Sequence, residues 1–153
     1  MKYREVITYK SYFEDFFSKQ SRKVQDKIIK ILDFLEQVER VPITYLKYIE
    51  GTNGLFEIRV QLASDIFRIF CCFDGNNLVI LFSGFQKKTQ KTPHNEIERA
   101  LKIMNEYYND KNSDKWKIYI HSIKSRPNTM AKLAHANATD SKMSSRRCVL
   151  AIK

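Results

Sequence analysis

The sequence lacks most of what marks secreted and membrane proteins. Its 153 residues include three cysteines, two of them adjacent (Cys71 and Cys72), so they make no disulfide framework and fit a reducing compartment. No stretch approaches the roughly 18–20 uncharged apolar residues that span a bilayer. The first residues carry no apolar signal core. We therefore expect a cytoplasmic protein that does not interact with membranes.

Residues for several kinds of chemistry are also scarce. Three histidines leave few metal ligands, and no Cys/His spacing is typical of a metal site. There is no Gly-rich phosphate loop among the four glycines. A lone pair, Ser83 and His94, does not establish a nucleophile. These absences favour a function that needs neither a metal nor another cofactor.

Positive charge is what the chain has in excess. Lys and Arg number 27 against 17 Asp and Glu, a formal net charge of +10, which points first to nucleic acid as a partner. The excess is uneven: residues 1–112 carry +3, and residues 113–153 carry +7. The second segment is poor in aromatic residues and has no sustained periodicity. We predict a folded domain over 1–112 and a basic tail over 113–153, largely disordered or an appendage.

Hydrophobic periodicity within residues 1–112 predicts an α+β domain with the order β-α-α-β-β-β-α. A short strand over 2–8 precedes two helices, over 11–20 and from Ser21 to Pro42, which form a hairpin. Three strands of an antiparallel meander follow. Thr92 as N-cap and Pro93 in the first turn open a last helix. The predicted strands cover 55–62, 66–73 and 78–87.

Strand parity predicts which side chains share a face of this sheet. If the apolar residues of the first two meander strands point to one core, the first turn pairs Gln61 with Arg68 or a neighbour of equal parity. Arg59, Gln61 and Arg68 then lie on the face away from the core helices. A two- or four-residue second turn pairs Phe73 with Leu78. It then adds Ser83, Phe85 and Lys87 to the arginine face, and sends Leu78, Ile80 and Phe82 to the core.

The resulting surface has the composition of a nucleic-acid site. Two arginines, an aromatic ring and a lysine share it, and Lys88 and Lys91 follow where the last strand leaves the sheet. His94 lies in the first turn of the last helix, whose N-terminal amides attract phosphate. Such a cluster can bind a phosphate backbone and stack a base.

Four segments carry a resemblance to a known family. They contain the patterns G-x-x-E-[IL]-R, R-[IV] and F-x-K-K-T-x-K-T-P, in that order. The chain resembles the RelE/HigB superfamily of type II toxin–antitoxin toxins, in its phage-derived branch, over roughly residues 1–110. The segments are 54–59 (GLFEIR), 67–69 (FRI), 81–93 (LFSGFQKKTQKTP) and 96–100 (EIERA).

That resemblance implies a RelE-like fold and a ribosome-dependent, metal-independent mRNA endonuclease that inhibits translation. The partners implied are the ribosome, mRNA and a cognate antitoxin, typically a helix-turn-helix protein. In such toxins the ribose 2′-hydroxyl attacks the adjacent phosphate and leaves a cyclic phosphate. Carried over by motif position, the implied catalytic residues are Arg59, Arg68, Lys87 and His94, and the implied RNA-binding residues are Phe85, Lys88, Lys91 and Thr92.

Structural interpretations of the same residues stay open. Arg59 can simply pair with Glu57, and Arg68 can be a cross-strand partner. The lysines can form only a solvated loop. Phe85 can belong to the core, and His94 can be a bystander.

Two other functions also remain possible on the sequence. A ParE-like relative would bind DNA gyrase and cleave no RNA. An inactive nucleic-acid-binding remnant is the third reading, because a tail added after the last helix can obstruct the site.

Overall fold

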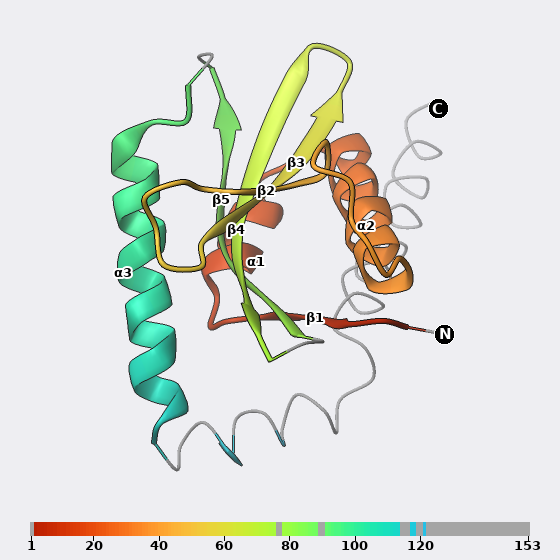
Figure 1. Cartoon of the computed structure of the whole chain (residues 1–153). Helices are drawn as coiled ribbons and strands as arrows, with labels where there is room; N and C mark the ends of the chain where they lie inside the picture. Colours follow the sequence, from red (N-terminus) through yellow and green to blue (C-terminus); the bar gives the residue numbers. More distant parts are fainter. Residues whose placement is uncertain (1, 76–77, 89–90, 114–116, 119–120, 122–153) are drawn as a thin grey trace, which may run out of the picture.

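A computed structural model describes residues 2–75, 78–88, 91–113, 117–118 and 121. It shows an α+β fold in which helices flank one five-stranded sheet, as predicted (Figure 1). The prediction missed one short strand, β2, and gave the first strand and first helix too many residues. The elements are β1 (Glu5–Thr8), α1 (Tyr12–Phe17), α2 (Arg22–Gln37), β2 (Leu46–Tyr48), β3 (Phe56–Leu62), β4 (Asp65–Asp74), β5 (Leu78–Lys87) and α3 (His94–Lys111).

The sheet has the strand order β1-β5-β4-β3-β2. The three long strands form the predicted antiparallel meander, and β2 adds to the β3 edge. β1 lies parallel to β5 at the other edge, with Val6 opposite Val79. The chain between these parallel strands runs through α1, α2 and the strands β2 to β4, and so supplies the long connection that a parallel pair needs.

Two hydrophobic cores form, one on each face of the sheet. The first gathers α1 and α2 over β3 and β4, because the apolar residues of α2, such as Ile28 and Leu35, recur at three- and four-residue steps. The second places α3 over Phe70, Cys72 and Phe82. In Figure 1, α2 and α3 accordingly lie on opposite sides of the sheet.

The predicted parity of β3 and β4 is confirmed. Gln61 pairs with Ile66, which has the same parity as the predicted partner, and Arg59 therefore lies opposite Arg68. Ile58 and Ile69 point into the first core. The arginines consequently share the face away from α1 and α2.

For β5, the predicted face is correct for Phe85 and Lys87 at the end of the strand and wrong for Phe82 before it. The register changes between β4 and β5, so that two residues, Phe82 and Ser83, lie opposite the single residue Phe70. Phe82 packs in the α3 core and Leu81 in the hairpin core, the reverse of the prediction for Phe82. The side chains of residues 78–80 lie outside those that the structure describes.

The bulge is followed by a close approach that requires glycine. At Gly84 a Cβ atom would lie 2.5 Å from two atoms of the Phe16 ring. The absent side chain therefore lets α1 pack directly on β5.

The ends of the helices differ in detail from the prediction. Ser21 is the N-cap of α2, as expected, although its hydroxyl makes no capping hydrogen bond. The helix ends at Gln37, well before Pro42. Pro93, not Thr92, is the N-cap of α3, since the backbone of Pro93 is extended, with a ψ of 138°, and the Thr92 hydroxyl donates instead to a carboxylate of β3.

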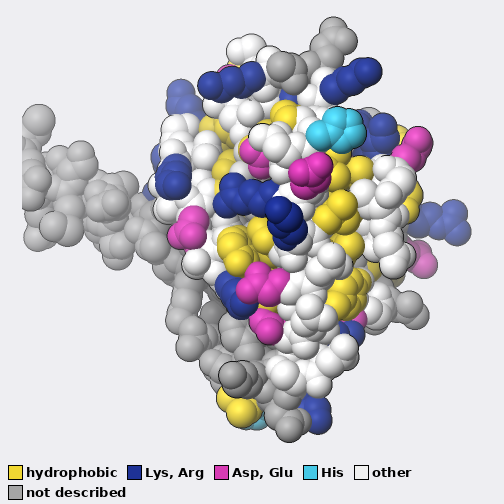
Figure 2. Space-filling model, turned by 90° about the vertical axis from the view of Figure 1, so that its left-hand side faces the viewer, with side chains coloured by type: hydrophobic (Ala, Val, Ile, Leu, Met, Phe, Trp, Pro, Cys, Tyr) yellow, Lys and Arg dark blue, Asp and Glu magenta, His cyan; other side chains and the backbone are white. Residues whose placement is uncertain are grey.

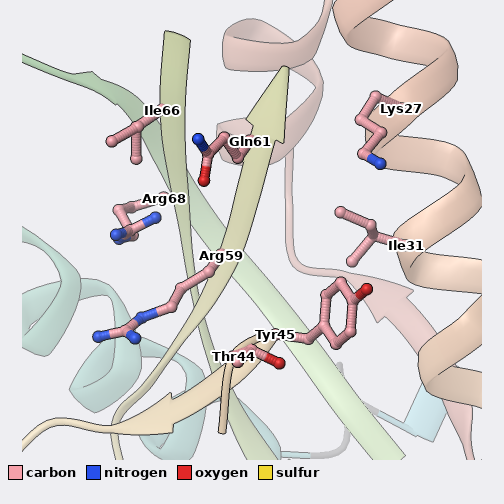
Figure 3. Close-up of a pocket in the computed structure, with 8 residues that line it drawn as sticks. All are labelled: Lys27, Ile31, Thr44, Tyr45, Arg59, Gln61, Ile66 and Arg68. Atoms are coloured by element: carbon pink, nitrogen blue, oxygen red, sulfur yellow. The ribbon is translucent and has the colours of Figure 1, made fainter. Parts of the chain in front are cut away.

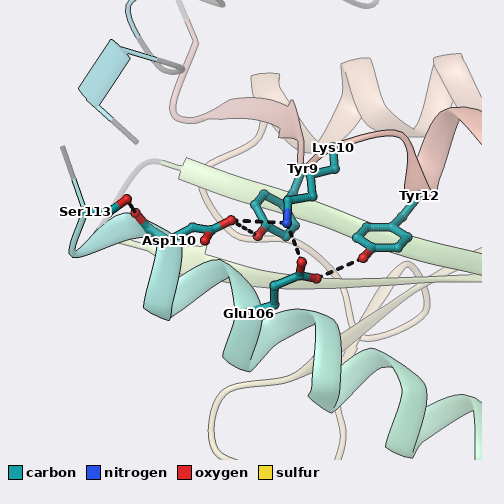
Figure 4. Close-up of polar contacts among 6 residues, drawn as sticks. All are labelled: Tyr9, Lys10, Tyr12, Glu106, Asp110 and Ser113. Carbon is teal, nitrogen blue, oxygen red and sulfur yellow. Dashed lines mark hydrogen bonds and ion pairs between the residues drawn. The ribbon is translucent and has the colours of Figure 1, made fainter. Parts of the chain in front are cut away.

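A polar cluster fastens the far end of α3 to the turn between β1 and α1 (Figure 4). Tyr9 donates a hydrogen bond to Asp110 (2.6 Å), and Tyr12 donates one to Glu106 (2.9 Å). Lys10 forms ion pairs with both acids. The cluster thus holds α3 along its second half on the sheet.

The predicted tail falls almost wholly outside the described residues. After α3 ends at Lys111, the structure describes 112–113, 117–118 and 121, so the proposed boundary at residue 112 stays a prediction. Within the part of the chain that is described, no helix combines the length and apolar character needed to cross a bilayer.

Candidate functional site

The candidate site is a set of side chains in register across β3, β4 and β5. Arg59 lies opposite Arg68, and Arg68 lies opposite Phe85. The next row of the same face places Ile66 between Gln61 and Lys87. Strand pairing therefore brings together four predicted site residues from sequence positions up to 28 apart.

A buried carboxylate lies among these cations. The Glu57 side chain is 7% exposed, and its Oε1 accepts a hydrogen bond from Arg59 Nε at 3.0 Å. The same oxygen lies 3.5 Å from Arg68 Nε in an ion pair. The Thr92 hydroxyl donates to Oε2 at 3.1 Å and thereby joins the loop before α3 to the sheet. The alternative in which Arg59 pairs with Glu57 is thus realised within the site.

The electrostatics of the site are dominated by positive charge. Burial lowers the pKa of the Arg68 guanidinium, Glu57 opposes that shift and Arg59 adds to it. Burial and then Arg68 lower the pKa of Lys87, and Arg59 and Lys47 act in the same direction. Glu57 opposes both of these shifts. Four cations, Arg59, Arg68, Lys47 and Lys87, therefore lie about one carboxylate, and their excess positive charge attracts an anion.

Like charges directly opposite each other destabilise a sheet, and Arg68 is almost fully buried. The Arg68 Nε atom has no hydrogen-bond partner within the described structure. A buried guanidinium opposite a second one lowers the stability of the fold, and perturbed charged groups of this kind are more common at functional sites.

The remaining predicted residues differ in how the structure connects them to this centre. Phe85 is half-buried and its ring stacks on Phe70, with centroids 5.7 Å apart, so it belongs partly to the α3 core. His94 is exposed at the first residue of α3. Lys88 and Lys91 are exposed on either side of residues 89–90, which lie outside the described chain.

Arg59 and Arg68 also line a pocket of about 490 Å³ beside β3. It runs along the strand edge beyond the end of β2, between the arginines on one side and α2 on the other (Figure 3). Lys27 of α2 and Tyr45 line it opposite the arginines. The face seen in Figure 2 carries interspersed basic and acidic side chains instead of one broad basic patch.

Three residues of this region are not among the predicted site residues. The sequence places Glu57 two residues before Arg59 on the same strand face, and it was considered only as an alternative ion-pair partner of Arg59. Lys47 of β2 lies opposite Glu57 of β3 in the sheet, and β2 was not predicted. Tyr45 lies in an irregular segment with no periodicity, so no signal pointed to it.

A comparison with protein families gives one match. The model described as "Phage derived protein Gp49-like (DUF891)" matches residues 15–105, which include all the strands of the meander and most of α3. A comparison with curated proteins gives no match.

Proposed function

Because this chain belongs to the Gp49-like family of phage-derived proteins, which suggests a toxin of a toxin–antitoxin system, we propose that it is a RelE/HigB-type toxin that cleaves mRNA on the ribosome. The observation that carries the proposal is the opposed pair Arg59 and Arg68, held by buried Glu57 beside Lys87. Its partners in this proposal are the ribosome, mRNA and a cognate antitoxin.

The proposed reaction is attack of a ribose 2′-hydroxyl on the adjacent phosphate. The 2′-oxygen forms a bond to phosphorus, the bond to the 5′-oxygen breaks, and a 2′,3′-cyclic phosphate remains. Negative charge grows on the phosphoryl oxygens in the transition state, and two fixed guanidinium groups stabilise it without moving. Glu57 fixes the orientation of both groups through the contacts at 3.0 and 3.5 Å.

Proton transfer needs a second kind of group. The lowered pKa of Lys87 brings its amine nearer to the range in which it exchanges a proton with the 2′-hydroxyl or the leaving oxygen. His94 is the other candidate, from the exposed first residue of α3. Phe85, Lys88, Lys91 and Thr92 would position the RNA around this centre.

Substitution of the cations tests the proposal in cells. Arg59→Ala and Lys87→Ala should each relieve the growth arrest caused by the expressed chain, because loss of one charge-stabilising group typically lowers a rate about 10²–10³-fold. Arg22→Ala on α2 and Lys102→Ala on α3 are matched exposed controls and should stay toxic.

The same variants separate the rival target. If Arg59→Ala and Lys87→Ala both remain toxic while DNA supercoiling fails, the chain acts on gyrase and the nuclease proposal is wrong. Immunoblots must show equal amounts of each variant, because a poorly folded toxin would also permit growth.

A further inference from the structure

The pocket beside β3 has an open strand edge at its centre. β2 pairs with residues 56–58 of β3 and then ends, so the part of β3 from Arg59 onward has no strand partner on that side in the described structure. Arg59 N–H instead donates to the carbonyl of Tyr45 at 2.7 Å, which fixes the backbone of the segment before β2 against the strand. The pocket wall is therefore formed by well-defined backbone.

The lining of the pocket is complementary to a phosphate. Lys27, Arg59 and Arg68 contribute three cations, and no carboxylate is among the described residues that line it. Arg68 lines both this pocket and the candidate active site, where its Nε lies 3.5 Å from Glu57 Oε1 in an ion pair that leaves Nε without a hydrogen bond in the described structure. An anion that extends from the site into the pocket would meet Arg59 and Lys27 in turn.

The lining also contains a platform for a base. Tyr45 is 37% exposed, and its ring packs on Phe34 of α2 with centroids 5.2 Å apart. That contact supports the ring from α2 while it remains a wall of the pocket (Figure 3). The Thr44 hydroxyl and the Gln61 amide are further hydrogen-bonding groups of the lining. The volume of about 490 Å³ lies in the range typical of small-ligand sites, about 300–1,000 Å³.

We propose that this pocket is a subsite for one nucleotide of single-stranded RNA next to the cut. The base stacks on Tyr45, and the phosphate lies between Lys27 and Arg59. This inference rests on the proposed function, since it extends the RNA path from Arg68 across the β3 edge to α2. Single-stranded RNA is favoured as occupant because cations and an exposed ring are the two elements by which proteins hold unpaired strands.

Binding of an uncleavable RNA tests the subsite apart from catalysis. The full chain is titrated into a short, labelled 2′-O-methyl RNA, which lacks the attacking hydroxyl, and fluorescence anisotropy is measured. Tyr45→Ala should weaken binding about tenfold, because stacking on one aromatic ring contributes about 1–3 kcal/mol per base. Tyr45→Phe should bind within about twofold of the unchanged chain, since the ring is kept.

Salt dependence tests the phosphate contact. Lys27→Gln should reduce the slope of log affinity against log salt concentration by about 0.7, the value for one phosphate of a single strand. Lys30→Gln is the matched control, an exposed lysine one turn further along α2 that does not line the pocket, and its slope should be unchanged. Thermal melts show whether each variant is folded. If Tyr45→Ala does not fold, Lys27→Gln still tests the subsite.

Photocross-linking locates the base directly. A 5-iodouracil in the same oligonucleotide should form an adduct with Tyr45, identified by mass spectrometry of the digested protein. Three results would each overturn the subsite. In the first, Tyr45→Ala and Lys27→Gln bind RNA as tightly as the unchanged chain; in the second, the adduct forms only at residues other than Tyr45; in the third, the unchanged chain does not bind RNA. These results would be expected if the pocket instead holds a partner protein.

The two proposals fail in different ways. If the chain binds RNA through Tyr45 and Lys27 but leaves mRNA intact on ribosomes, the pocket is still a site for one RNA nucleotide and the nuclease proposal is wrong. If the chain cuts mRNA and both pocket variants bind and cut like the unchanged chain, the subsite is wrong and the nuclease proposal stands.

Discussion

At the scale of single residues, the site depends on one carboxylate, Glu57, which the sequence suggested only as an alternative partner of Arg59 and not as a site residue. Arg59 and Arg68 were singled out from their motifs and from strand parity, and the register of β3 and β4 places them opposite each other. Glu57 makes this arrangement stable, because it balances part of the positive charge from a buried position. Parity alone gives a face, but it gives neither burial nor the choice of partner within that face.

Loss of this carboxylate should therefore be costly. Glu57→Gln keeps the size of the side chain but leaves Arg68 buried beside Arg59 without a counter-ion, and removal of one partner of a buried pair typically lowers stability by about 3–5 kcal/mol. We expect a fall of about 3 kcal/mol in the free energy of unfolding, measured by urea denaturation. Glu50→Gln, at an exposed acid, should change it by less than about 0.5 kcal/mol. Equal small changes in both variants would show that Glu57 does not stabilise the pair.

At the scale of elements, the helices and the three long strands followed from periodicity, whereas two features did not. The bulge at Phe82 and Ser83 shifts the register, and an alternating pattern contains no sign of an inserted residue. β2 is three residues long, with Leu46 only partly buried against the first core and Tyr48 exposed, so it is too short to produce an alternating pattern. Both lie where tertiary contacts form: Gly84, directly after the bulge, packs against the Phe16 ring, and β2 pairs with the edge of β3.

The polar cluster at the end of α3 makes a prediction at this scale (Figure 4). Lys10, with help from Tyr12, lowers the pKa of Glu106 below its ordinary value of 4.5, although burial acts against it. A lowered folded-state pKa means that the stabilisation is complete above that ordinary value and is lost as the pH falls through the folded-state pKa. The difference in unfolding free energy between the unchanged chain and Glu106→Gln should accordingly vanish in strong acid.

The expected size of that difference is small. The Glu106 side chain is 40% exposed, so solvent screening leaves about 0.5 kcal/mol at neutral pH. Chemical denaturation at neutral pH and near pH 2 measures it, with Glu98→Gln on the exposed side of α3 as the control. A difference that stays constant with pH, or grows in acid, would contradict this account of the cluster.

At the scale of the whole molecule, net charge turns out to be a poor guide to the site. The +10 of the chain comes mostly from residues 113–153, which lie beyond the family match at 15–105. The candidate site owes its positive character to where a few cations lie: Arg59, Arg68 and Lys87 meet because three strands align them. Strand parity allowed that alignment to be predicted from the sequence. Lys47 was not predicted as a site residue because its strand, β2, was not predicted.

The most direct test of the account is to map mRNA ends in a translation reaction assembled from purified components. The full chain is added to a defined mRNA with and without ribosomes, and the 3′ ends of the products are sequenced and their chemistry is determined. The account predicts cuts within codons, with 2′,3′-cyclic phosphate ends, only when ribosomes are present, and none with Arg68→Ala. Intact mRNA in the presence of ribosomes and active, folded protein would contradict it.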